Sequence, residues 1–156
     1  MTDEADQTTQ VEIRKRAMDL LARREHAYGE LVTKLAKRDY ARDAIEIALD
    51  TLVDDGLLSD ARFAEASVAA KARRGIGPVR IRAELRGVGV ADSTVEAALA
   101  AAEVDWASRA AAAREKRFGI EWPEDFAAKA KQMRFLQRRG FDGDQLAAAF
   151  DDAPGL

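Results

Sequence analysis

The stretch Leu85–Leu99, LRGVGVADSTVEAAL, has a counterpart about 50 residues before it and another about 50 residues after it. The earlier copy, Leu35–Leu49, reads LAKRDYARDAIEIAL, and the later copy, Leu136–Phe150, reads LQRRGFDGDQLAAAF. Large apolar residues recur at four matching places in each copy: Leu35, Tyr40, Ile45 and Leu49; Leu85, Val90, Val95 and Leu99; Leu136, Phe141, Leu146 and Phe150. A basic or glycine-containing turn follows each leucine, so each copy predicts a helix, a tight turn and a second helix. Units of this kind stack into arrays that bind other macromolecules along an extended face.

The composition narrows the possible classes of protein. Alanine accounts for 33 residues, which favours thin, close helix packing in an elongated array over one thick globular core. The chain has no cysteine and one histidine, which excludes disulfides, thiolate zinc sites and histidine-rich metal sites. We therefore expect no metal and no cofactor. No apolar run approaches the roughly 20 residues that span a bilayer, so we expect a soluble, cytoplasmic protein without a membrane partner.

The helical periodicity predicts an all-α fold of three tandem three-helix repeats. The expected helices are 11–24, 28–38 and 42–55; 60–73, 78–86 and 93–102; 104–117, 123–139 and 144–151. The corresponding domains are a disordered acidic N-terminal tail at 1–10, repeats at 11–58, 59–102 and 103–152, and a C-terminal tail at 153–156. No alternating run of β-branched residues occurs, so no strand is expected.

Several residues predict how these helices begin and which face is buried. Asp43 followed by Glu46, and Ser93 followed by Glu96, have the spacing of capping boxes, and Pro123 suits a first helical position. The expected buried stripe of the 42–55 helix is Ile45, Ala48, Leu49, Leu52 and Val53.

Positive charge is concentrated in the middle of the chain. The net charge is −3, but residues 60–139 carry 16 basic against 11 acidic side chains, and both flanking segments are acidic. Within 71–86, only Glu84 opposes six cations: Lys71, Arg73, Arg74, Arg80, Arg82 and Arg86. We predict that these six bind a partner, because a local positive potential attracts phosphate groups or an acidic protein surface. The alternative is an ordinary solvated helix face.

The turn Gly75-Ile76-Gly77-Pro78 is not a nucleotide-binding loop. A dinucleotide fingerprint requires a preceding strand and a third glycine, and a Walker loop ends in Gly-Lys-Ser/Thr. We expect a glycine turn between two helices, with Gly77 as the N-cap. The amide groups at this helix start, together with Arg80, remain a possible site for a phosphate or a carboxylate.

Other chemically notable residues favour structural roles, and no catalytic constellation is found. His26 is interpreted as a local cap or surface residue, because no second histidine accompanies it. The aromatic residues of the third repeat are interpreted as core rather than as a base-stacking platform: Trp106, Phe118, Trp122, Phe126 and Phe135. The pairs Asp54-Asp55 and Asp151-Asp152 are interpreted as solvated helix ends rather than as a metal site.

The run Asp60–Leu85, DARFAEASVAAKARRGIGPVRIRAEL, resembles the central signature of the bacterial RecX family, regulators of the RecA recombinase. The matching positions are Arg62, Phe63, Ala64, Val68, Arg73, Arg74, Gly75, Gly77, Pro78, Arg80, Ile81, Glu84 and Leu85. Upstream, LLARREHAYGELVTKL resembles the first unit of the family, and downstream FLQRRGF resembles the last. Where relatives commonly place Ser-Arg, this chain has Ala27-Tyr28, which removes a capping side chain and a charge.

The resemblance covers residues 15–150 and implies a fold and a partner. The fold would be three tandem three-helix units in an elongated, curved array that is right-handed or solenoid-like. The protein would be a monomer that binds RecA and its filaments on single-stranded DNA, mainly inhibiting strand exchange, ATP hydrolysis and co-protease activity. One alternative is a helical-repeat module that binds DNA directly without RecA. Weak DNA affinity would also be compatible with RecA binding. The other alternative is an enzyme, but the sequence has no clustered acid-base set.

Overall fold

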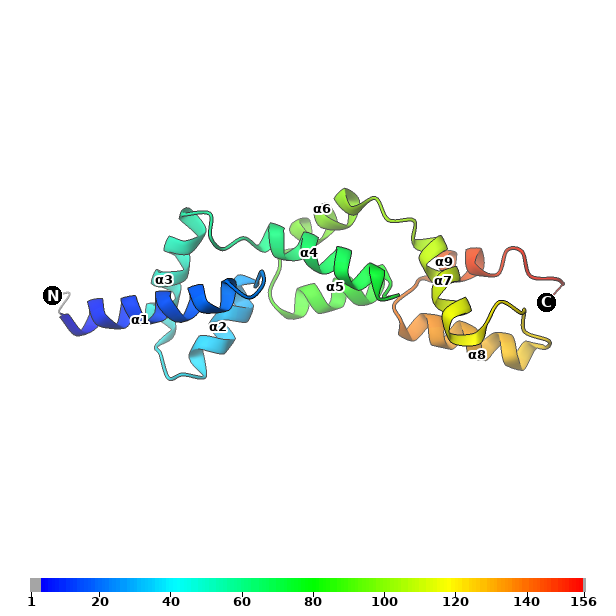
Figure 1. The fold of residues 1–156 in the computed structure, drawn as a ribbon, viewed down its shortest axis with the longest axis horizontal. Helices are drawn as coiled ribbons and strands as arrows, with labels where there is room; N and C mark the ends of the chain where they lie inside the picture. Colours follow the sequence, from blue (N-terminus) through cyan, green and yellow to red (C-terminus); the bar gives the residue numbers. More distant parts are fainter. Residues whose placement is uncertain (1–3, 156) are drawn as a thin grey trace. The chain divides into compact units, whose positions relative to one another are not determined.

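The computed structural model describes residues 4–155, and these residues form α-helices without any strand (Figure 1). The helices are α1 (Glu4–Leu21), α2 (Tyr28–Ala36), α3 (Arg42–Asp54), α4 (Asp60–Arg73), α5 (Pro78–Gly87), α6 (Asp92–Ala102), α7 (Trp106–Phe118), α8 (Phe126–Arg138) and α9 (Gly143–Ala149). The all-α class and the three groups of three helices are confirmed. None of the helices within this range combines the length and apolar character needed to cross a membrane.

Helix α1 is longer than the sequence predicted. It begins at Glu4, so residues 4–10, expected to be a disordered tail, are helical, and residues 1–3 lie outside the described range. Two features explain the extension. Glu4 and Asp6 place negative charge at the positive end of the helix dipole. The Gln10 side chain donates to the Ala44 carbonyl oxygen at 2.9 Å, which fastens this part of α1 to α3.

Two predicted capping boxes and the predicted start of α8 are wrong, although α3 begins at Arg42 as predicted. Asp43 and Ser93 lie one residue inside α3 and α6, so neither is the N-cap of a capping box. Helix α8 begins three residues after Pro123, because the carboxylate of Asp125 accepts a hydrogen bond from the Ala128 amide and so caps the helix at that point. An aspartate N-cap satisfies an otherwise unpaired amide, which proline at the same place would not do.

The chain folds as two compact units that share the middle repeat. One is formed by residues up to Ala66 together with Leu85–Glu96, and the other by Ser67–Glu84 together with the residues from Ala97 onward. The divisions fall inside α4, α5 and α6. Each unit is therefore described by itself.

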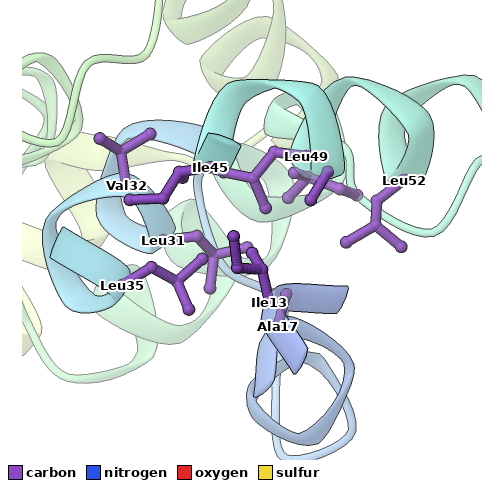
Figure 2. Close-up of a cluster of buried hydrophobic side chains, with 10 residues drawn as sticks. Ile13, Ala17, Leu31, Val32, Leu35, Ile45, Leu49 and Leu52 are labelled. Atoms are coloured by element: carbon purple, nitrogen blue, oxygen red, sulfur yellow. The ribbon is translucent and has the colours of Figure 1, made fainter. Parts of the chain in front are cut away.

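The core of the first unit is formed where α1, α2 and α3 meet. Figure 2 shows their side chains converging: Ile13 and Ala17 from α1; Leu31, Val32 and Leu35 from α2; Ile45, Leu49 and Leu52 from α3. Val53, predicted to be buried with this stripe, is 45% exposed. At 100° per residue it lies about 80° from Ile45 around the helix, at the edge of the buried face.

The repeat pattern is confirmed as a pattern of buried residues. Of its twelve positions, all are buried except Tyr40, which is half-buried. In the third repeat the core comprises Ala110, Leu136, Phe141, Leu146, Ala149 and Phe150. Trp106, Trp122 and Phe135 pack against this core, and Phe118 meets the edge of Phe135 at 5.3 Å between ring centroids. Phe126, also predicted to be core, is 74% exposed because it lies at the first position of α8.

A buried arginine lies among these aromatic rings. Arg114 is 1% exposed, and its guanidinium carbon lies 4.2 Å from the centroid of the Trp122 ring. Its Nη1 donates to the Gln132 side-chain oxygen at 3.4 Å and to the Glu121 carbonyl oxygen at 3.3 Å. A ring face and two neutral oxygen acceptors stabilise the charge, whereas the buried Nε has no hydrogen-bond partner among the described residues.

Consecutive repeats meet at glycines in both units. In the first unit, a Cβ atom on Gly29, near the start of α2, would collide with the carbonyl oxygen of Val88 in the turn after α5. In the second unit, a Cβ atom on Gly77, just before α5, would lie 2.5 Å from the backbone of Gly140 in the turn after α8. The start of a second helix in one repeat therefore touches the turn of the next repeat, backbone against backbone.

Candidate binding surface

The six cations predicted to bind a partner fall into two classes. Glu84 is paired with Lys71 at 2.5 Å and with Arg80 at 3.0 Å. Partial burial raises the pKa of Glu84, but the hydrogen bonds from Lys71 and Arg80 outweigh it and hold the pKa below its ordinary value. Arg86 is paired with Asp92 at 2.7 Å. Arg82 is half-buried and also engaged. These four cations are already held by this chain.

Arg73 and Arg74 belong to a different environment, a cavity of about 270 Å³ in the second unit. The cavity is lined by six cations, which we call the cationic pocket: Arg73, Arg74, Arg109, Lys116, Arg117 and Arg139. Small or apolar residues form the rest of its wall, namely Ala72, Gly75, Ala112, Ala113 and Phe135. Its lining includes no acidic residue from the part of the chain that the structure describes.

Local helix geometry explains why these side chains converge. Helix α4 ends at Arg73, because Gly75 adopts a φ of +79° and the Ile76 amide turns back to the Lys71 carbonyl oxygen at 3.0 Å. On α7, Arg109 and Lys116 are seven residues apart and share a face, with two alanines between them. Short alanine side chains leave the cavity open between the two cations.

The aromatic ring of Phe135 orders two of the guanidinium groups. The guanidinium carbon of Arg139 lies 5.2 Å from the ring centroid, and that of Arg117 lies 6.0 Å from it. Arg139 Nη1 also donates to the carbonyl oxygen of Arg74 at 3.4 Å. Both arginines are therefore positioned by contacts that leave their charge uncompensated.

The carboxylates of the described residues do not neutralise the pocket. Within residues 4–155, none of its six cations has an acidic partner within 4.0 Å, in contrast to Lys71, Arg80 and Arg86. Five of the six side chains are exposed, and Arg139 is half-buried. Five of the cations lie near the carboxyl ends of α4, α7 and α8, and Arg109 lies in the first turn of α7. Helix dipoles stabilise positive charge at carboxyl ends, but each dipole contributes only about half an elementary charge. The pocket thus keeps a strong positive potential.

The possible anion site at the start of α5 is not available. The Gly77 amide donates to the Arg139 carbonyl oxygen at 2.7 Å, and the Val79 amide donates to the Gly140 carbonyl oxygen at 2.9 Å. Pro78 between them has no amide hydrogen. Gly77 does serve as the expected cap, since its carbonyl oxygen accepts from Ile81 at 3.1 Å. The proposed role of these amides in holding a phosphate is therefore wrong, because the next repeat already occupies them.

His26 is not at the surface. It is 2% exposed, with Nδ1 3.1 Å from the Arg24 carbonyl oxygen and Nε2 3.0 Å from the Lys34 ammonium. Burial lowers the pKa of the ring, so the neutral form donates from Nδ1 and accepts from Lys34 at Nε2. Its role is structural, with one partner in the turn after α1 and one on α2.

A second basic cavity lies in the first unit, and unlike the cationic pocket it has an acidic residue in its wall. This cavity of about 460 Å³ is lined by Arg16, Arg23, Lys34, Lys37 and Arg38, but also by Asp19. Lys34 is engaged with His26, and Arg16 Nε donates to the Tyr40 hydroxyl at 3.0 Å. The cationic pocket of the second unit therefore has the larger excess of positive charge.

Sequence reasoning missed four members of the cationic pocket, Arg109, Lys116, Arg117 and Arg139. The spacing of Arg109, Ala112, Ala113 and Lys116 could have indicated the pocket from the sequence, because it places two cations and two small residues on one helix face. Nothing in the described part of the chain groups three or more histidines or carboxylates in a metal-binding arrangement.

The architecture and this surface define a class: an all-α repeat protein of three-helix units with a basic pocket. Three family models match the chain, each describing one unit. These are the first three-helix domain of RecX at residues 14–52, the second at 59–99 and the third at 95–150. The chain belongs to the RecX family.

Individual relatives agree with the family models. The chain is 48% identical to regulatory protein RecX of Halorhodospira halophila over 137 residues, covering 88% of this chain and 85% of the relative. It is 45% identical to regulatory protein RecX of Pseudomonas syringae pv. tomato, covering 88% and 89%. The crystal structure of RecX from Lactobacillus salivarius aligns with a TM-score of 0.77 at 22% identity, covering 93% of this chain and 96% of that one. This last likeness concerns the fold.

Proposed function

We propose that this protein binds RecA and RecA filaments on single-stranded DNA and regulates them, mainly by inhibiting strand exchange, ATP hydrolysis and co-protease activity. The observation that supports this proposal most strongly is the match of all three RecX domain models, in order, to residues 14–52, 59–99 and 95–150. The domain limits we propose for the repeats are 11–58, 59–102 and 103–152. The role is one of binding rather than catalysis, exercised by a monomer in the cytoplasm without a cofactor.

Co-sedimentation tests the proposal. The protein should sediment with RecA assembled on single-stranded DNA, and much less with the same DNA alone at matched salt. A strand-exchange reaction should slow as the protein is added, with the DNA concentration held constant. Equal sedimentation with naked DNA and with filaments would contradict the proposal.

Direct DNA binding without RecA is the second candidate, favoured by a cavity whose six cations have no acidic partner within the described residues. Its signature is a steep decrease of the affinity for naked DNA as salt increases, because cations that contact phosphates release condensed counterions. RecA should then add nothing to the affinity. The two candidates are thus separated by one titration with and without RecA.

A further inference from the structure

We propose that the cationic pocket is a phosphate-binding site that holds the backbone of single-stranded nucleic acid. The inference rests on the proposed function, in which the filament contains such a strand, and it assigns the contact to particular side chains. It moves the centre of recognition away from Arg80, Arg82 and Arg86, which are engaged within the chain, toward the third repeat.

The directions from which the cations approach favour phosphate over carboxylate. Arg73 and Arg74 come from the end of α4, Arg109 and Lys116 from one face of α7, and Arg139 from the residue after α8. A phosphate is tetrahedral and accepts hydrogen bonds from several directions, whereas the acceptor positions of a carboxylate lie in one plane. Donors that converge from three helices therefore suit a phosphate.

The density of charge favours a polymer of phosphates over a protein segment. Six cations surround about 270 Å³ without an acidic partner among residues 4–155. A single strand carries one negative charge on every nucleotide and is narrow enough to pass through an open cavity. An acidic protein segment would need several neighbouring carboxylates on one thin protrusion to supply the same charge.

The apolar parts of the pocket wall fit the same ligand. The half-buried ring of Phe135 lies close to the guanidinium groups of both Arg117 and Arg139, and two alanines separate Arg109 from Lys116. Arginine planes and aromatic rings accept nucleobases by stacking without selecting their identity. The site should therefore bind with little sequence preference.

Fluorescence anisotropy with a labelled 20-nucleotide oligothymidylate tests the site. The test variant is Arg73→Gln with Arg74→Gln, and the matched control is Arg80→Gln with Arg86→Gln. Both remove two positive charges from exposed side chains of the same segment, and circular dichroism monitors the fold of each. A third variant, Lys116→Gln, reports on α7 alone.

We expect the test variant to bind the oligonucleotide on the order of tenfold more weakly, with the slope of log affinity against log salt smaller by about 1.4. The control should keep the slope of the unaltered protein. An oligonucleotide with a neutral methylphosphonate backbone should bind poorly to all of them. Equal losses in test and control variants, no binding by the unaltered protein at low salt, or tighter binding to polyglutamate than to the oligonucleotide would each overturn the inference.

Filament co-sedimentation of the same variants separates this inference from the proposed function. If the protein binds filaments but the pocket variant binds oligonucleotide normally, the pocket assignment is wrong and the proposed function stands. If oligonucleotide binding depends on the pocket but filaments are ignored, the pocket assignment stands and the proposed function is wrong.

Discussion

His26 is the single histidine of the chain, and its ring is buried. The free energy of unfolding should therefore depend on pH through this one residue. Burial lowers the pKa of the ring below its ordinary value of 6.5, with the positive charge of Arg24 adding to the effect and the hydrogen bond to the Arg24 carbonyl opposing it. In the unfolded chain the ring titrates at the ordinary value. Between the two pKa values the unfolded state therefore binds a proton that the folded state does not.

We expect the free energy of unfolding to decrease as pH falls from 6.5 through the lowered pKa of His26, and to be independent of this residue above 6.5. Urea denaturation at several pH values measures it. The variant His26→Asn retains a donor for the Arg24 carbonyl oxygen and should lose the slope in this window. Glu30, whose pKa is lowered from 4.5, contributes only at more acidic pH. An unchanged slope in the variant would assign the dependence to other groups.

Asp60 supplies the cap that the sequence of α2 lacks. The N-cap residue Ala27 has no polar side chain, but the Tyr28 amide donates to Asp60 Oδ1 at 2.8 Å, from a residue 32 positions away. We expect Asp60→Ala to lower the free energy of unfolding by about 1 kcal/mol, the ordinary cost of a lost cap. Thermal denaturation is the measurement.

Asp43→Ala is the matched control for Asp60→Ala. Asp43 lies inside the first turn of α3, and its carboxylate contacts only the adjacent amide of Ala44 among the described hydrogen bonds. Asp43→Ala should therefore lower the free energy of unfolding by less than Asp60→Ala does. A larger effect at Asp43 would mean that the acidic side chain nearest in sequence, and not the distant one, stabilises the first repeat.

At the scale of helices, the buried stripe of α3 predicts that two apolar residues one turn apart contribute very differently to the free energy of unfolding. Leu49 is fully buried, whereas Val53 on the same helix is 45% exposed. Leu49→Ala should cost on the order of 2–5 kcal/mol through lost burial and the cavity that remains. Val53→Ala should cost much less. Chemical denaturation compares the two, and similar costs would mean that the core of the first unit is misassigned.

The glycines at the junctions between repeats predict a second contrast. Gly77→Ala would place a methyl group 2.5 Å from backbone atoms of Gly140, whereas Gly143→Ala meets no atom within 4 Å. We expect a cost of about 1–3 kcal/mol for Gly77→Ala, as for overpacking, and a neutral or slightly stabilising effect for Gly143→Ala.

The first unit offers an independent copy of this comparison. Gly29→Ala would collide with the Val88 carbonyl oxygen, and Gly87→Ala meets nothing within 4 Å. Differential scanning calorimetry should show a lowered melting temperature for Gly29→Ala and not for Gly87→Ala. Equal melting temperatures would show that the junction can separate without affecting the stability of the unit.

The interior of each helix was predictable because its cause is local, whereas several helix ends were not. Apolar spacing located the interiors of the helices because burial repeats every turn, as at Ile45, Ala48, Leu49 and Leu52. The extension of α1 to Glu4 was not predictable, because Gln10 donates to the carbonyl oxygen of Ala44, 34 positions away. The cationic pocket combines Arg73 with Arg139, 66 positions away, and only folding shows that the two meet.

At the scale of the molecule, the repeat composition predicts a measurable dimension. The large apolar residues are divided among three similar units, so we expect an array and not a single globule. Small-angle X-ray scattering should give a radius of gyration clearly above about 15 Å, the value for a compact chain of this length. A radius at the compact value would show that the repeats fold onto one another.

The turn between the second and third helices has a positive φ in every repeat, at Asp39 (+66°), Gly89 (+88°) and Gly140 (+100°). Only the two glycine turns lie against the helix start of a preceding repeat. The middle repeat is therefore the one that carries a contact element for both neighbours, Gly89 for the repeat before it and Gly77 for the repeat after it. A lengthened protein could be made by inserting a second copy of residues 59–102, because each new junction would join a glycine turn to a glycine helix start. Duplicating the first repeat would instead place the side chain of Asp39 where backbone must approach backbone, so the middle segment is the natural module for engineering longer arrays.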